Sequence, residues 1–142
     1  MTENEKDLLL KDLCARLPYG VICKDDYAKV EGKLVQIGIN YDMCLLSDDY
    51  GKTEFAYIPN CKPYLFPLSS MTEEQYNEMQ TISGKDCMEH MEIEKEWRNN
   101  SPFTHLPLYQ HRVIEFFHKY HFDYRGLIPM GLAIDATGKN IY

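Results

Sequence analysis

The sequence lacks any apolar run long enough to cross a lipid bilayer. Its longest uninterrupted apolar stretches are a few residues each, such as Leu8–Leu10 and Gly131–Ile134, whereas a spanning helix needs about 20. The first residues, Met1–Asp7, also lack the basic start, apolar middle and small-residue cleavage site of a secretory signal. The sequence therefore predicts a cytoplasmic protein that makes no membrane contact.

Paired cysteines are missing as well. The five cysteines are an odd number, spread from Cys14 to Cys87, and they lack the short paired spacings of a disulfide framework. We therefore expect reduced thiols, most of them buried.

Basic side chains are fewer than acidic ones. The chain has 15 Lys and Arg against 22 Asp and Glu, a formal net charge of −7. Because affinity for a duplex comes largely from Lys and Arg that neutralise phosphates, general nucleic-acid binding is disfavoured. Residues 108–142 are the exception, with 4 basic and 3 acidic side chains. Contact with nucleic acid by this quarter, with stacking by Phe122 and Tyr124, stays open as an alternative.

Three motifs of catalysis or phosphate binding are absent. The sequence contains no Gly-x-Ser-x-Gly elbow, no Gly-x4-Gly-Lys-Ser/Thr loop and no His-Glu-x-x-His helix. Adjacent carboxylates such as Asp48 and Asp49 lie at predicted turns, where they interact favourably with exposed backbone N–H groups. These features favour a binding protein over an enzyme.

The sequence does contain enough apolar residues for a core. Its 142 residues are 44% apolar and 13% aromatic, a composition that suits one compact domain over residues 1–142. A capping box, Thr2-x-x-Glu5, precedes an apolar helical face and predicts a helix over residues 3–17. Apolar runs and alternating patterns then predict a small antiparallel sheet over residues 19–59.

The remainder of the chain is predicted to be largely helical, over residues 70–128. Ser70-x-x-Glu73 is a second capping box, and residues 108–121 carry the last helical pattern. Two prolines in residues 60–68 predict an irregular connector between the sheet and these helices. The fold class is therefore α+β, an N-terminal helix, a small bent sheet and C-terminal helices, with closure of the sheet into a partial SH3-like barrel left open.

Two blocks of the sequence, Tyr120–Gly138 and Lys62–Glu74, resemble a group of short proteins from gut-bacterial genomes and their prophages. The first block reads FDYRGLI, followed by GLAIDATG. The resemblance implies an accessory role in a phage or mobile element. It implies no activity, cofactor or catalytic residue at individual positions.

Tyrosine is abundant, with eleven in the chain. Tyrosine offers contact area at low entropic cost and a polar tip, so it is favoured both at interfaces and on half-buried sheets. Four tyrosines on or beside the predicted sheet are candidates for contacting a protein partner: Tyr41, Tyr50, Tyr57 and Tyr64.

Arg125 is a further candidate binding residue. It could fork onto the carboxylate of Asp123 or Asp135 and pin the tail to the core, or join Arg112 and Lys119 in an anion-contacting patch.

A metal site is the main alternative to protein binding. His111, Glu115 and His118 have spacings of i, i+4 and i+7, which place them on one helical face, and His121 could add a fourth ligand. Imidazole and carboxylate suit zinc or another divalent metal, and such a site would support a small metal-dependent hydrolase. An ordinary solvated helix surface explains the pattern equally well. Cys87 and His90 form a second candidate half-site.

Overall fold

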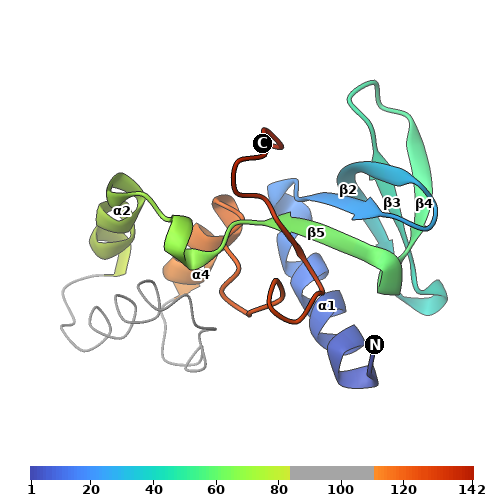
Figure 1. The fold of residues 1–142 in the computed structure, drawn as a ribbon, viewed down its shortest axis with the longest axis horizontal. Helices are drawn as coiled ribbons and strands as arrows, with labels where there is room; N and C mark the ends of the chain where they lie inside the picture. The colour runs from blue at the N-terminus through green and yellow to red at the C-terminus, as the bar shows by residue number, and fades with distance from the viewer. Residues whose placement is uncertain (84–110) are drawn as a thin grey trace.

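The computed structural model describes residues 1–83 and 111–142. Figure 1 shows strands β2, β3 and β4 at one end of the molecule and helices α2 and α4 at the other. An N-terminal helix, a mostly antiparallel sheet and later helices confirm the α+β class. In these two ranges, no helix is both long and apolar enough to cross a membrane.

Helix α1 (Glu3–Arg16) confirms the predicted N-terminal helix and its capping box. The Thr2 side chain accepts a hydrogen bond from the Glu5 backbone N–H (3.2 Å), and the Glu5 carboxylate accepts one from the Thr2 N–H (2.6 Å). Leu17 begins a 3-10 turn, Leu17–Tyr19, which contains Pro18. Because proline ends regular helical pairing, the α-helix stops one residue earlier than predicted.

Within residues 1–83 and 111–142 the sheet has six strands, in the order β4-β3-β2-β1-β5-β6. All neighbours are antiparallel except β5 and β6. The strands are β1 (Ile22–Asp25), β2 (Val30–Gly38), β3 (Met43–Ser47), β4 (Thr53–Tyr57), β5 (Cys61–Leu65) and β6 (Ile134–Asp135). In the described part of the chain β4 and β5 share no ladder, so the sheet stays open rather than closing into a barrel.

Strand β5 corrects the prediction of an irregular connector over residues 60–68. Pro63 lies within the strand, opposite Cys23 of β1, whereas β6 pairs only at Tyr64 and Leu65. Proline is tolerated where a strand has a neighbour on one side only, and Pro63 occupies such a position. The predicted limits of 19–59 were therefore too narrow.

The inner face of the sheet packs against α1 in the first hydrophobic core. Leu9 and Leu13 of α1 are fully buried against strand residues such as Leu34, Leu46 and Ala56. The core also contains three buried free thiols: Cys23, Cys44 and Cys61. A hydrogen bond to a neighbouring thiol (Cys61 for Cys44, Cys23 for Cys61), together with burial, raises the pKa of the Cys44 and Cys61 thiols, which disfavours their reactive thiolate form.

Helices α2 (Glu73–Ser83) and α4 (His111–Lys119) form a second, aromatic core with the residues that follow α4. The cap of α2 differs from the prediction. Thr72 and Gln75 exchange hydrogen bonds between backbone N–H and side chain, whereas the Ser70 hydroxyl donates to the Pro67 carbonyl. Threonine is therefore the N-cap, and the serine belongs to the preceding 3-10 turn, Leu68–Ser70.

Candidate functional site

Three of the four candidate tyrosines lie on the surface of the sheet, and one does not. Tyr41 is 80% exposed, Tyr50 is 96% exposed at the turn between β3 and β4, and Tyr57 is 43% exposed at the end of β4. Tyr64 is only 6% exposed, and its hydroxyl donates to the Glu31 carboxylate (2.8 Å) on the face of β5 opposite the core residues Cys61 and Leu65. The structure therefore brings Tyr41 and Tyr57 to one end of β2–β4 and leaves Tyr64 out of that surface.

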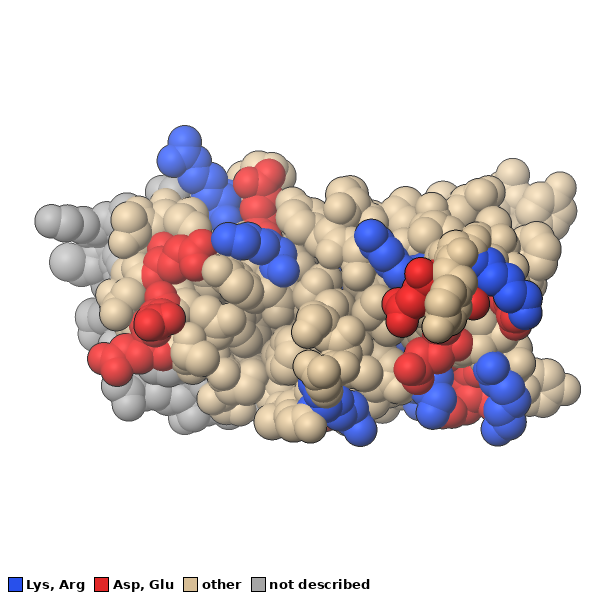
Figure 2. All heavy atoms as spheres, turned by 90° about the horizontal axis from the view of Figure 1, so that it is seen from above, with Lys and Arg blue, Asp and Glu red and all other residues tan. Residues whose placement is uncertain are grey.

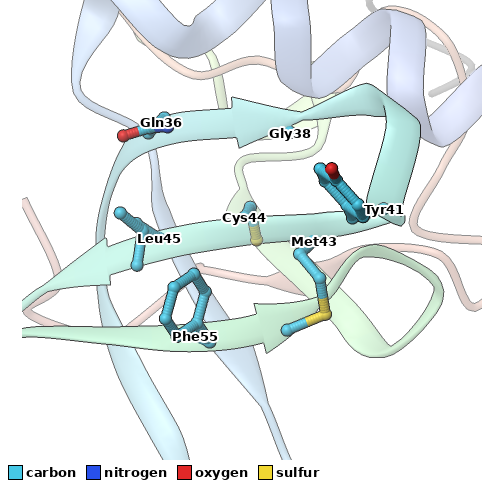
Figure 3. A pocket seen from close by; sticks show the side chains of 7 residues that line it. All are labelled: Gln36, Gly38, Tyr41, Met43, Cys44, Leu45 and Phe55. Atoms are coloured by element: carbon cyan, nitrogen blue, oxygen red, sulfur yellow. The ribbon is translucent and has the colours of Figure 1, made fainter.

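The surface beside these tyrosines is the outer face of strands β2, β3 and β4. Strand register places Gln36, Leu45 and Phe55 in one row across the three strands, and Gly38, Met43 and Tyr57 in the next. Successive residues of a strand point to opposite faces, so both rows share the face away from α1. Figure 3 shows Gln36, Met43, Leu45 and Phe55 of this face, with Tyr41 at one end. We call this region the outer sheet face.

The hollow on the outer sheet face has a volume of about 400 Å³ and a mainly apolar lining. Gly38 contributes no side chain, which leaves space between Tyr41 and Met43. Phe55 is 67% exposed at its edge, and Val35 and Ile39 are exposed nearby. Exposed apolar surface that is contiguous is a common feature of interaction sites in soluble proteins. The lining residues are Gln36, Gly38, Tyr41, Met43, Cys44, Leu45 and Phe55.

Strand β4 borders this hollow and is an edge strand of the sheet in the described part of the chain. Asp48 N–H donates to the Lys52 carbonyl (2.9 Å) and Ile58 N–H to the Asp42 carbonyl (2.8 Å). Hydrogen-bonded pairs alternate along an antiparallel ladder, so even-numbered residues of β4 direct their N–H and C=O groups toward β3. The backbone groups of Thr53 and Phe55 therefore point away from the sheet, and no described residue pairs with them.

At the Tyr57 end of β4, a buried carboxylate accepts a hydrogen bond from the backbone and leaves no free N–H for another strand. Asp25 Oδ2 accepts a hydrogen bond from the Tyr57 N–H (3.2 Å), and its other oxygen accepts from Tyr27 and Ala28 in the β1–β2 turn. Asp25 is 1% exposed, so this contact holds the end of β4 against the turn. The open part of the edge is therefore the stretch through Thr53 and Phe55.

The surroundings of the outer sheet face are acidic. Residues 30–57 contain five acidic and two basic side chains. Within the described ranges, Asp48 and Asp49 at the β3–β4 turn form no ion pair with a cation. Figure 2 shows acidic and basic side chains interleaved on the visible face, without a continuous basic tract. The ion pairs that neutralise other acids nearby are Lys6 with Asp42 (2.7 Å) and Lys52 with Glu54.

Arg125 lies away from this surface, in a buried charge cluster. Its Nε is 3.1 Å from Asp12 Oδ1, and Arg16 Nε donates to the other oxygen of the same carboxylate (2.7 Å). The predicted partners are engaged elsewhere: Asp123 accepts from the Leu127 and Ile128 N–H groups, and Asp135 from Thr137 N–H. Arg125 therefore connects the tail to α1, with a different carboxylate from those predicted.

The four candidate metal ligands do not share one surface. His111, largely exposed, pairs with Glu115 (3.1 Å), whereas His118 is buried with Nε2 2.7 Å from the Tyr124 hydroxyl. His121 is buried and stacks on Tyr142 (3.9 Å between ring centroids).

Burial lowers the pKa of both His118 and His121 to about 4, and the nearby Arg16 charge acts in the same direction. Among residues 1–83 and 111–142 no three His, Cys, Asp or Glu side chains are grouped to hold a metal. The metal site stays a prediction, and Cys87 and His90 lie outside the described residues.

A second hollow, of about 430 Å³, lies between α2 and the C-terminal tail. Several polar side chains on its wall are already paired: Ser70 with Pro67, Thr72 with Gln75, and Lys119 with Glu78. The two aromatics considered for base stacking, Phe122 and Tyr124, are buried. The outer sheet face is therefore the stronger candidate for binding.

No protein family, no curated protein and no solved structure matches this chain. The geometry of the outer sheet face therefore carries the functional inference. Sequence reasoning identified Tyr41 and Tyr57 on this surface but missed Phe55, Met43 and Leu45. Alternation in Thr53–Tyr57 could have indicated Phe55, because threonine, phenylalanine and tyrosine occupy one face of that strand.

Proposed function

We propose that this chain is a non-enzymatic binding protein that holds an apolar segment of a protein partner on the outer sheet face. The observation that carries the proposal is the exposed apolar hollow between Tyr41 and Phe55, beside the edge of β4 that no described strand pairs with. Burying apolar surface contributes about 25 cal/mol per Å², so covering this face favours association. The cytoplasmic, phage or mobile-element setting predicted from the sequence is part of the proposal.

The arrangement of side chains around the hollow suits contact better than chemistry. Among the described residues its lining includes no carboxylate, histidine or lysine, and the thiol pKa of its cysteine, Cys44, is raised. Aromatic residues and methionine are the types enriched at the centres of protein interfaces. Phe55, Tyr41 and Met43 would therefore supply most of the binding energy.

The proposal is tested by using the full chain as bait in a lysate with three versions of the protein. Phe55→Asp puts a charge into the apolar face, and Met130→Asp makes the same change at an exposed methionine outside it. We expect a specific protein to be retained by the unmodified chain and by Met130→Asp, and lost with Phe55→Asp. Equal retention by all three versions would overturn the proposal.

A further inference from the structure

We infer that the segment held on the outer sheet face is an extended, basic peptide stretch of the partner that adds to β4 as another strand. This inference rests on the proposed function and specifies the partner at the same site. It follows from the free backbone groups of β4, the spacing of side chains beside them and the charge around the edge.

The backbone of β4 provides a template for an added strand. Thr53 and Phe55 each present an N–H and a C=O away from β3, with no partner in the described part of the chain. The β3–β4 ladder is regular over all five pairs, and β4 contains neither proline nor a bulge. Natural edge strands are usually protected by such devices, so an edge without them is suited to pairing with another chain.

The side chains of β4 indicate the pattern that an added strand would need. A neighbouring strand lies about 4.8 Å away, and its alternate residues fall on the same face as Thr53, Phe55 and Tyr57. Thr53 and Phe55 are both exposed on that face within the open part of the edge, so apolar side chains opposite them would be covered on one side, the one opposite Phe55 by its aromatic ring. The pattern predicted for the peptide is therefore apolar at alternate positions.

Charge selects a basic peptide rather than a second copy of this chain. Asp48 and Asp49 lie at the turn where the open edge begins, and they carry no paired cation among the described residues. A second copy would bring the same acidic turn and a net charge of −7 to the edge, and like charges would repel. Lysine or arginine beside the apolar positions of a partner would instead be attracted to this turn.

The first test selects binders from a displayed library of linear peptides, using the full-length chain as target. We expect selected peptides to share alternate apolar residues and a net positive charge. Selection of acidic peptides, or of peptides without alternation, would overturn the inference. Reversible dimers in sedimentation of the free chain that disappear in Thr53→Pro would also overturn it, because they would make a second copy the occupant.

The second test changes the backbone of β4 while preserving its ladder with β3. Thr53→Pro removes the outward N–H, and Thr53→Ala is the matched control that keeps it. We expect Thr53→Pro to raise the dissociation constant of a selected peptide at least about tenfold. Thr53→Ala should change this constant less than about threefold. Equal binding by both variants would overturn strand addition.

The third test leaves the protein unchanged, so it does not depend on how a variant folds. Single N-methyl groups are placed in turn along the selected peptide, each removing one N–H. We expect affinity to fall at every second position, because only alternate N–H groups of an added strand face β4. A uniform response would overturn strand addition and leave the proposed function standing, whereas failure of both peptide selection and protein capture would reject both.

Discussion

The Asp12 carboxylate is the counter-ion of two arginines in the interior of the protein. Its carboxylate is fully buried and faces two guanidinium groups, Arg16 on its own helix and Arg125 from the tail. Arg16 Nη2 also donates to the Phe122 carbonyl (2.8 Å), and both arginines lie over the Tyr124 ring. These contacts connect α1 to the chain segment that follows α4.

Removing the carboxylate charge should cost more than removing the tail arginine. Asp12→Asn leaves a buried Arg16 without its counter-ion, and breaking a buried pair in this way costs about 3–5 kcal/mol. Arg125→Met keeps the Asp12–Arg16 pair, and we expect a loss of about 1–2 kcal/mol. Urea unfolding of the two variants measures both values. A larger loss for Arg125→Met would contradict this account of the cluster.

The sequence predicted, as one of two alternatives, that Arg125 would bind the carboxylate of Asp123 or Asp135, whereas the structure pairs it with Asp12. Asp123 and Asp135 are close to Arg125 along the chain, and each is occupied by backbone N–H groups of its own turn. Asp12 becomes a neighbour only when α1 packs beside the tail. Pairings between distant segments depend on tertiary packing, which local pattern does not encode.

At the scale of elements, the sequence was most informative where a motif is local. The capping box at Thr2 and Glu5 predicted the start of α1, and the turn predicted at Asp48 and Asp49 is the one that joins β3 to β4. The prediction failed for β5, because Pro63 reads as a strand breaker unless one knows that only one neighbour lies beside it.

The cap of α2 gives a test at this scale. Thr72→Ala removes the acceptor for the Gln75 N–H, and we expect it to lower the free energy of unfolding by about 1 kcal/mol. Thr72→Ser keeps an acceptor and should cost only a few tenths of that amount. Amide exchange at Gln75 should accelerate in Thr72→Ala and stay unchanged in Ser70→Ala. Faster exchange in Ser70→Ala alone would restore the serine as the cap.

At the scale of the whole molecule, two buried histidines make stability depend on pH. An unfolded histidine binds its proton near pH 6.5, whereas His118 and His121 in the folded chain do so only near pH 4. Between these values the unfolded chain binds more protons, so stability is greatest above about pH 6.5 and falls as the pH falls toward 4. Each histidine contributes a slope of up to about 1.4 kcal/mol per pH unit.

Unfolding measured between pH 7 and pH 4.5 tests this effect with two matched variants. His118→Gln should reduce the slope of stability against pH. His111→Gln changes an exposed histidine on the same helix and should leave the slope as it is. If both variants keep the slope of the unmodified chain, burial of His118 is not its cause.

The sequence predicted part of the candidate site, because the residue types on a strand can be seen locally whereas their burial depends on tertiary packing. Tyrosine content pointed to the sheet, and Tyr41 and Tyr57 do lie beside the hollow. Tyr64 could not be distinguished from them, because its burial depends on distant parts of the chain, where Glu31 accepts from its hydroxyl and the Tyr142 hydroxyl donates to its carbonyl. The openness of β4 is a property of the whole sheet, since it requires that the described part of the chain provide no further strand beyond it.

The most direct test of the outer sheet face as a binding surface is amide hydrogen exchange along β4, in the free chain and with a selected peptide bound. In the free chain Thr53 and Phe55 should exchange quickly, while Glu54 and Ala56, which face β3, exchange slowly. With peptide bound, Thr53 and Phe55 should become slow as well. Slow exchange at both residues in the free chain, or no change on binding, would contradict the account.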